Sequence, residues 1–267
     1  MKTDIPAGQD PPDDTMPPET TLDHVLGGRL VLRQSAHGHR VGHDAMLLAA
    51  FGPPRCRHVV DMGAGVGSAG LAFLTRCPDA RGTLVELEPA MAELAGENIR
   101  LNGLSGRCDV VCADVTTIAH PKGPSLPAAS SADLVLMNPP YNSDAAHRTS
   151  PHAGRALAHM APHSLLREWV VAASRCLSPQ GTLCLIHRPT DIVAILDALA
   201  GRFGAVELMP VHARPNAPAL RLLVRAIKER RTAPVILPGL VLADEAGMPS
   251  PAAEAILRGA EALSPPG

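Results

Sequence analysis

The sequence predicts an α/β fold with a mostly parallel sheet, an antiparallel last strand and helices on both faces. From His58 onward, short apolar runs alternate with helix-like segments, which is the pattern of a parallel sheet covered on both faces. The last two strand-like runs, Ala205–Met209 and Ala219–Ile227, follow each other without a helix, so we expect them to pair antiparallel. The chain is 46% hydrophobic but only 2% aromatic, which predicts a core of Ala, Leu and Val.

Two elements are expected before this alternation. Gly28–Gln34 has the character of a short strand. Asp44–Phe51 has the character of a helix that Asp44 caps and that Pro53-Pro54 ends.

The alternating part begins with strand His58–Asp61. Its best-delimited element is the helix Pro89–Leu101, because Pro stands at its start and Asn102-Gly103 at its end. The other expected elements, in chain order, are helix Ser68–Arg76, strands Thr83–Leu87, Asp109–Ala113 and Asp133–Met137, helix Ser164–Leu177, strand Gly181–His187, helix Asp191–Ala200, the apolar run Leu240–Leu242 and a short helix Ala252–Arg258.

Composition divides the chain into four parts. Residues 1–20 hold five prolines and five acidic residues, which predicts a disordered leader. Residues 21–57 are expected to form an N-terminal cap that precedes the first sheet strand. Residues 58–231 are expected to form the main domain, and residues 232–267 a C-terminal appendage packed on it.

Charge and cysteine content narrow the functional class. The net charge of −2 does not mark a nucleic-acid binder as a whole, although Arg214–Arg231 concentrates basic residues. This stretch is either a phosphate-binding patch or a solvated strand end with its loop.

The six cysteines form no C-x-x-C pair, the N-terminus lacks a secretion signal, and no apolar run reaches about 18 residues. We therefore expect a cytoplasmic protein without a membrane span. The histidines at 37–43 and 159–163 lack a further ligand at suitable spacing, so no metal is expected.

A glycine-rich loop follows the first sheet strand and opens a helix, in the segment Asp61-Met62-Gly63-Ala64-Gly65-Val66-Gly67-Ser68. Glycines permit a tight turn and a close approach of the backbone to a ligand. A pyrophosphate-binding loop would have its third Gly where Ser68 stands. Asp61 suits a ligand with a positive ammonium better than one with phosphates. The alternative is a plain strand–helix turn.

Acidic residues follow the next two strands. Glu86 ends the second strand, about 20 residues past the glycines, where a carboxylate accepts hydrogen bonds from both ribose hydroxyls of a bound nucleoside. Glu88 is a nearby alternative that we expect to cap the following helix. Asp114 ends the third strand and is placed to accept from an adenine amino group, or else serves as a turn or cap residue.

The fourth strand ends in Asn138-Pro139-Pro140-Tyr141, which contains the single tyrosine of the chain. The Asn side chain offers an acceptor and a donor, and each Pro fixes φ, so the carbonyls are held in a set orientation. The Tyr ring offers a flat face for stacking. The motif therefore predicts a clamp for a planar group that bears an NH2.

Together these motifs resemble class I S-adenosylmethionine-dependent methyltransferases, with their Rossmann-like fold. The glycine loop (Asp61, Gly63, Gly65, Gly67) matches the first motif of that family, Glu86 its ribose-binding acid, and Asp114 its adenine-side acid. The clamp matches the Asn/Asp-Pro-Pro-Tyr/Phe motif of members that methylate nitrogen conjugated to a planar system. The resemblance implies S-adenosyl-L-methionine as the cofactor, with Asn138 also contacting it, and a catalytic set of Asn138, Pro139 and Tyr141.

Further segments resemble bacterial tRNA adenine-N6 methyltransferases that act beside the anticodon of a valine tRNA, and this resemblance implies tRNA as the partner, bound through a single-stranded loop with a flipped adenine. The matching segments are Leu26–Gln34, Gly38–Ala49, Ser150–His159, Ile186–Arg188 and Arg221–Leu240. The resemblance of these segments also implies that Gln34 and Arg40 contact the cofactor. The expected substrate contacts are Pro140, Tyr141, Arg148, Arg155 and Arg188. The segment Asn142–His163, rich in Arg and His, is expected to be a lid that meets the nucleic acid, or else a surface crossover.

Other functions remain open at this point. Glutamine-N5 protein methyltransferases and guanine-N2 rRNA methyltransferases share the Asn-Pro-Pro-Tyr clamp. A non-catalytic RNA-binding module is a reading of another class. A nicotinamide oxidoreductase is disfavoured by Ser68 and by the two prolines of the clamp.

Overall fold

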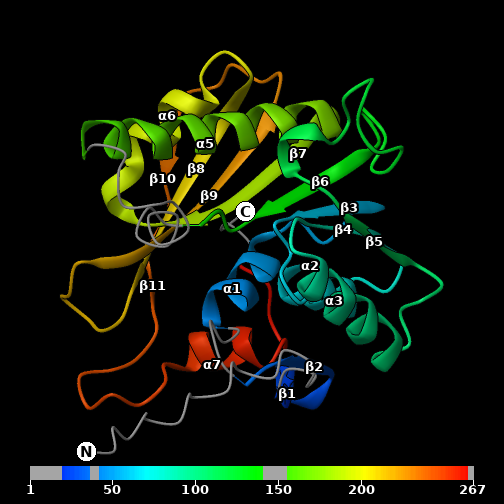
Figure 1. The fold of residues 1–267 in the computed structure, drawn as a ribbon. Coiled ribbons are helices and arrows are strands. Elements are labelled where there is room, and N and C mark those ends of the chain that lie inside the picture. Colours follow the sequence, from blue (N-terminus) through cyan, green and yellow to red (C-terminus); the bar gives the residue numbers. More distant parts are fainter. Residues whose placement is uncertain (1–19, 37–41, 141–154, 264–267) are drawn as a thin grey trace, which may run out of the picture.

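Short aliphatic runs of the chain build a central sheet of nine strands (Figure 1). In this computed structural model the described residues are 20–36, 42–140 and 155–263, with side chains in the last range from Ser164 onward. The strands are β3 (His58–Met62), β4 (Arg81–Glu86), β5 (Cys108–Cys112), β6 (Ala132–Met137), β7 (Leu177–His187), β8 (Phe203–His212), β9 (Ala219–Lys228), β10 (Val235–Ile236) and β11 (Leu240–Val241).

The sheet order is β10-β8-β9-β7-β6-β3-β4-β5, with β11 also paired to β8. Strands β5, β4, β3, β6 and β7 are parallel, and β9 runs antiparallel to both β7 and β8. The expected fold is therefore confirmed, including the antiparallel pairing of the last two predicted strands. The carboxyl ends of the parallel strands share one edge of the sheet.

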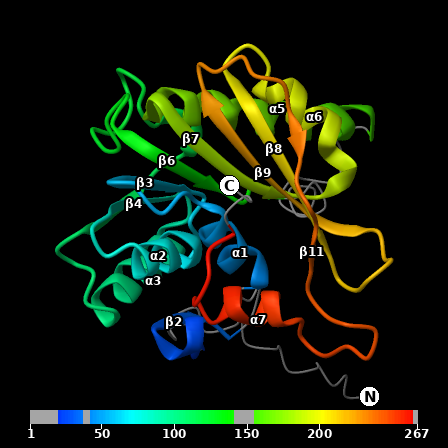
Figure 2. The ribbon, with the colours of Figure 1, turned by 180° about the vertical axis from the view of Figure 1, so that it is seen from behind.

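Helices cover both faces because the strands are apolar on both faces. In β6, Leu134 and Leu136 point into one buried cluster, while Val135 and Met137 point into the other. Figures 1 and 2 show one layer of helices below the sheet and a second layer above it. The helices of the first layer are α1 (His43–Phe51), α2 (Ser68–Arg76) and α3 (Pro89–Leu101), and those of the second are α5 (Arg155–Cys176) and α6 (Ile192–Leu199). Single 3₁₀ turns occur at η1 (Leu26–Gly28), η2 (Val115–Thr117) and η3 (Pro189–Asp191).

The N-terminal hairpin and the last described helix both lie on the α1–α3 side of the sheet (Figures 1 and 2). Strands β1 (Thr20–Val25) and β2 (Leu30–Ser35) form an antiparallel hairpin that packs on α3. Helix α7 (Pro251–Leu257) packs on α1, and two arginines, Arg29 and Arg76, donate to carbonyls at its C-terminal end. None of the described helices is both long and apolar enough to cross a membrane.

Several elements differ from the expectation. Gly42 occupies the N-cap of α1, and Asp44 lies inside the first turn, where its carboxylate pairs with Arg221 at 2.7 Å instead of capping. Helix α5 begins at Arg155, so the second half of the expected lid is helical. Strand β1, the partner of β2 in the hairpin, was not predicted. Its sequence contains no run of apolar residues, and its one leucine, Leu22, is exposed.

The basic stretch Arg214–Arg231 does not gather into one free patch. Besides the pairing of Arg221, the guanidinium of Arg225 pairs with Glu207 at 2.5 Å and lies 4.8 Å from the ring centre of Phe51. The ammonium of Lys228 donates to the carbonyl of Leu177. Arg221 and Arg225 lie on the same face of β9, because a strand places side chains i and i+4 on one face, and each of them binds a neighbouring element.

Candidate active site

Four of the predicted site residues meet at the carboxyl edge of the parallel strands. Glu86 is the last residue of β4, while Gly63, Asp114 and Asn138 follow β3, β5 and β6. All four line one pocket of about 590 Å³. A pocket of this size is ordinary for a small-molecule ligand. The other described residues that line it are Leu87, Glu88, Val115, Thr116, Pro139, Pro140, Leu165, Glu168 and Trp169.

The glycine loop takes a conformation that few other residues allow. Gly63, Gly65 and Gly67 have φ of 68°, 56° and 90°, and the amides of Gly63 and Ala64 both donate to the carbonyl of Val85 at 2.9 Å. A Cβ at Gly63 would lie 2.5 Å from Cη2 of Trp169, so a larger residue at this position is excluded. At Gly65 the same test meets no atom within 4 Å, which leaves the backbone open to a ligand.

Glu86 is oriented by backbone amides on either side. Its Oε2 accepts from the amide of Gly65 at 2.7 Å, and its Oε1 accepts from the amide of Glu88 at 2.9 Å. A carboxylate has about four acceptor sites, so each oxygen keeps one for a further donor. This arrangement suits a ligand that presents two adjacent hydroxyls.

Asp61 lies beneath the loop. It is 3% exposed, and its Oδ2 accepts from the amide of Gly70 in α2 at 2.7 Å. Burial, together with the charge of Glu86, raises the pKa of Asp61 to about 7, although the hydrogen bond from the Gly70 amide acts in the opposite direction. The side chain therefore joins the end of β3 to α2, and it is not among the residues that line the pocket.

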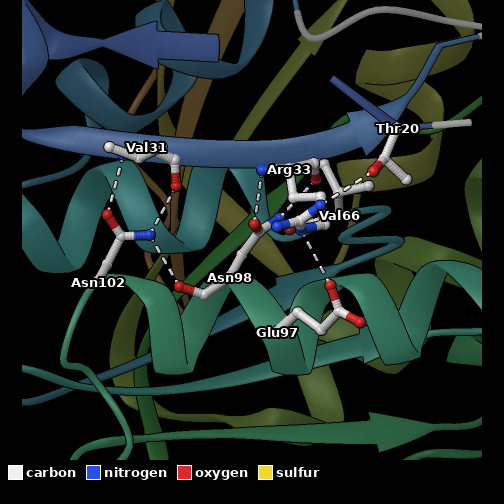
Figure 3. A network of polar contacts seen from close by, with 7 residues as sticks. All are labelled: Thr20, Val31, Arg33, Val66, Glu97, Asn98 and Asn102. Atoms are coloured by element: carbon white, nitrogen blue, oxygen red, sulfur yellow. Dashed lines mark hydrogen bonds and ion pairs between the residues drawn. The ribbon is translucent and has the colours of Figure 1, made fainter. Parts of the chain in front are cut away.

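A buried asparagine supports the loop from the other side (Figure 3). The amide nitrogen of Asn98 in α3 donates to the carbonyls of Val66, within the loop, and of Arg33, in β2, both at 2.9 Å. Its Oδ1 accepts from the amide of Arg33 at 2.7 Å. The N-terminal hairpin and the glycine loop are thus bound to the same side chain.

Asp114 has one of the two roles that the sequence left open, that of a cap, and it also lines the pocket. Its Oδ1 accepts from the amide and the hydroxyl of Thr116, each at 2.8 Å, and so caps η2. Its Oδ2 accepts no hydrogen bond from the described residues and is available toward the pocket that Asp114 lines. Capping holds the carboxylate in a fixed orientation.

At the end of β6, Asn138 and Pro140 are exposed and Pro139 is buried, and all three line the pocket. Tyr141, the fourth residue of the motif, lies outside the described residues. So do Arg40 and Arg148. The backbone of Arg155 begins α5, and its side chain is not described.

Two other candidates lie away from the pocket lining. Gln34 is 3% exposed in β2, and its amide donates to the carboxylate of Asp23 in the neighbouring strand. Arg188 follows β7 at the carboxyl edge, and its guanidinium pairs with Asp191 at 3.2 Å. Among the described residues, no group of three or more His, Cys, Asp or Glu side chains is arranged to hold a metal ion.

Helix α5 contributes pocket residues that the sequence did not reveal. Trp169 is part of the core, but it also forms a pocket wall against Gly63, and Leu165 and Glu168 lie beside it. Glu88 occupies the N-cap of α3, yet its side chain makes no capping hydrogen bond and lines the pocket instead. No local sequence pattern predicts the contacts of Leu165, Glu168 and Trp169 with the pocket, because these contacts depend on how α5 crosses the edge of the sheet.

The charge of the pocket distinguishes between ligands. Its described lining includes four carboxylates and no basic side chain; the acids are Glu86, Glu88, Asp114 and Glu168. Such a lining disfavours a pyrophosphate and favours a ligand that carries positive charge. A nucleoside with ribose hydroxyls and a sulfonium or ammonium group, as in S-adenosylmethionine, fits both the free acceptor sites of Glu86 and this charge.

Comparisons with known proteins point to methyltransferases. A family model described as "Methyltransferase small domain" matches residues 42–213. A protein of Porphyromonas gingivalis strain W83, named tRNA1(Val) (adenine(37)-N6)-methyltransferase, is 30% identical over 197 residues, which cover 71% of this chain and 75% of the relative. A protein of the same name from Yersinia pestis strain Pestoides F is 28% identical over 244 residues, covering 85% of this chain and 91% of the relative.

Solved structures show the same fold. An Agrobacterium tumefaciens protein described as a predicted O-methyltransferase superposes with a TM-score of 0.70 at 32% identity, covering 82% of this chain and 98% of that one. The complex of M. jannaschii TYW2 with AdoMet superposes with a TM-score of 0.52 at 16% identity, covering 81% and 89%. The chain therefore belongs to the methyltransferase small domain family and is an S-adenosylmethionine-dependent methyltransferase.

Proposed function

We propose that this enzyme methylates the exocyclic N6 amine of an adenine in tRNA, at position 37 beside the anticodon of a valine tRNA. The observation that carries the proposal is the position of Asn138-Pro139-Pro140, which line the same pocket as the acids that fit the cofactor. The names of the Porphyromonas and Yersinia relatives support the choice of adenine 37 in this tRNA.

In the proposed reaction, Asn138 and Pro139 activate the amine. The lone pair of an adenine amine is delocalised into the ring, so the amine is a weak nucleophile. The side-chain oxygen of Asn138 and the carbonyl oxygen of Pro139 accept hydrogen bonds from the two N–H groups of the amine. These hydrogen bonds favour a tetrahedral geometry at the nitrogen. These fixed dipoles also stabilise the positive charge that develops on nitrogen during attack.

S-adenosylmethionine, when bound, supplies an electrophilic methyl group on a positively charged sulfur. Gly63, Gly65, Gly67, Glu86 and Asp114 are proposed to hold it, with Asp61 acting through the loop. Holding donor and acceptor in line can lower the barrier by several kcal/mol, on the order of 7–11 kcal/mol at the limit. The chain needs no strong base, since the methylated nitrogen readily releases its proton to water.

The acceptor base must leave its stack to reach this pocket, which costs least in a single-stranded loop. Pro140 and Tyr141 are proposed to pack on the extruded base. Arg148, Arg155 and Arg188 are proposed to contact the RNA, Arg188 from an orientation set by Asp191. A tRNA substrate places the proposed reaction in the cytoplasm.

Transfer of tritiated methyl groups tests the proposal. We expect the purified enzyme to label a valine tRNA transcript that carries adenine at position 37 and not one that carries guanine there. Mass spectrometry of the digested product should identify N6-methyladenosine. Label in the glutamine of a release-factor-like protein or in guanine of rRNA would assign another acceptor, and tRNA binding without any methyl transfer would contradict the proposal.

A further inference from the structure

Asn98 is a fully buried polar side chain that uses both of its amide hydrogens and its oxygen. It is 0% exposed, and it binds the amide and the carbonyl of Arg33 in β2 and the carbonyl of Val66 in the glycine loop (Figure 3). An Asn side chain has one acceptor oxygen and two donor hydrogens, which match this set. Asp at this position would lack the donors, and Ala would leave three buried backbone groups unpaired.

Asn102, one turn further along α3, binds the hairpin alone. Its Oδ1 accepts from the amide of Val31 at 2.9 Å, and its Nδ2 donates to the carbonyls of Val31 at 2.7 Å and Asn98 at 2.8 Å. Figure 3 shows the two asparagines side by side under β2. They share the strand as partner, and the glycine loop is bound by Asn98 and not by Asn102.

The contact of Asn98 extends to the ribose-binding acid through one peptide. Val66 lies next to Gly65, whose amide donates to Glu86. A side chain that fixes the carbonyl of Val66 therefore also limits how the amide of Gly65 points. The ion pair between Arg33 and Glu97, at 3.2 Å and about 40% exposed, adds little to the docking because it is screened by water.

We propose that Asn98 is a positioning residue for the cofactor and that, through it, the β1–β2 hairpin is a structural part of the cofactor site. The hairpin holds Asn98 in a single orientation, Asn98 holds the loop at Val66, and the loop orients Glu86. Neither the hairpin nor Asn98 is required to touch the cofactor. This inference rests on the assignment of the pocket to the cofactor and is independent of the RNA acceptor.

The pair Asn98→Ala and Asn102→Ala tests this role, with the affinity for S-adenosylhomocysteine measured by calorimetry and stability by urea unfolding. Both variants lose buried hydrogen bonds to β2, so both are expected to unfold at lower urea. We expect Asn98→Ala to bind S-adenosylhomocysteine about tenfold more weakly, and Asn102→Ala to bind it as the unmodified enzyme does. Equal affinities in the two variants would overturn the proposal.

Two further measurements apply even if Asn98→Ala does not fold. Asn98→Asp keeps the acceptor for the Arg33 amide but cannot donate to Val66, and it is expected to weaken binding as well. In the unmodified enzyme, saturating S-adenosylhomocysteine should slow amide exchange at Arg33, whose amide donates to Asn98, because coupling between two sites is reciprocal. Unchanged exchange in β2 would contradict the inference. No RNA enters these assays, so their failure is distinct from failure of tRNA methylation.

Discussion

The two sides of the pocket are built differently. On the side of the glycine loop, two polar side chains that support the loop are buried and paired: Asp61 is 3% exposed and Asn98 is 0% exposed, and each binds the backbone of a neighbouring element. On the side of the clamp, Asn138 and Pro140 are exposed at the end of β6. The first side is held by the core, whereas the second faces outward.

This difference indicates a division of labour between the proposed donor and acceptor sides. A small cofactor can be enclosed by residues whose positions are set during folding. A base within a large RNA must enter from solvent, so the groups that receive it have to remain accessible. Changes on the donor side are therefore expected to affect affinity and stability together, and changes on the acceptor side to affect turnover alone.

The largest effect is expected from Asn138→Ala. Loss of the side-chain oxygen removes one of the two fixed acceptors for the amine, and removal of one such preorganised group from an active site lowers kcat on the order of 100- to 1000-fold. Since Asn138 lies at the end of β6 and is exposed, we expect unfolding by urea and the affinity for S-adenosylhomocysteine to change little. Single-turnover methyl transfer measures the first quantity and calorimetry the second.

Asn138→Asp is the matched control, because it retains an acceptor oxygen at the same position. This variant should keep measurable activity, well above that of Asn138→Ala. A loss of cofactor affinity in Asn138→Ala as large as its loss of turnover would place Asn138 on the donor side and remove the contrast between the two sides.

A smaller effect is expected at Trp169, which joins the core to the donor side. Trp169→Phe withdraws the ring edge from Gly63, and we expect cofactor affinity to fall about twofold to tenfold, in line with the roughly 0.5–1.5 kcal/mol that well-placed aromatic contacts contribute. Because Trp169 is the single tryptophan, its fluorescence in the unmodified enzyme should report cofactor binding directly.

The same fluorescence separates the two sides. S-adenosylhomocysteine should change the emission equally in the unmodified enzyme and in Asn138→Ala, while tRNA without cofactor should leave it unchanged. An emission spectrum that saturating S-adenosylhomocysteine does not alter would contradict the assignment of Trp169 to the pocket wall.

The sequence predicted the features that depend on residues close together in the chain, and it did not predict those that depend on residues far apart in the chain. The alternation of strands and helices and the α/β fold were predictable, because two-residue and 3.6-residue patterns are local. The rim position of Gly63, Glu86 and Asp114 was predictable too, because all parallel strands end at one edge. The pairing of Asp44 with Arg221 was not, since it joins residues 177 positions apart.

The pocket wall from α5 and the support from Asn98 also escaped prediction. Both depend on which helix crosses which loop, and the side chains concerned carry no local signature: Trp169 sits in an apolar run, and Asn98 sits inside a helix where asparagine is only mildly unfavourable. The catalytic roles of Asn138, Pro139 and Tyr141 rest on the motif and its resemblance and stay predictions.

The smallest effect concerns the buried carboxylate of the donor side. Burial raises the pKa of Asp61 to about 7 from 3.8, so its contribution to folding stability is complete below about pH 3.8 and is lost as pH rises through 7. A positively charged cofactor above the loop favours the ionised form. Cofactor affinity should therefore rise with pH, by at most about tenfold between pH 6 and 8, while the stability of the free enzyme falls.

Asp61→Asn isolates this group, because an amide oxygen can still accept from Gly70 but does not titrate. Calorimetry and thermal unfolding at pH 6, 7 and 8 should show both dependences in the unmodified enzyme and flatter ones in the variant. Opposite slopes for affinity and stability are the signature of a buried acid that the cofactor ionises. Parallel slopes, or slopes that Asp61→Asn leaves intact, would mean that other groups titrate and that Asp61 acts on the loop through its hydrogen bond alone.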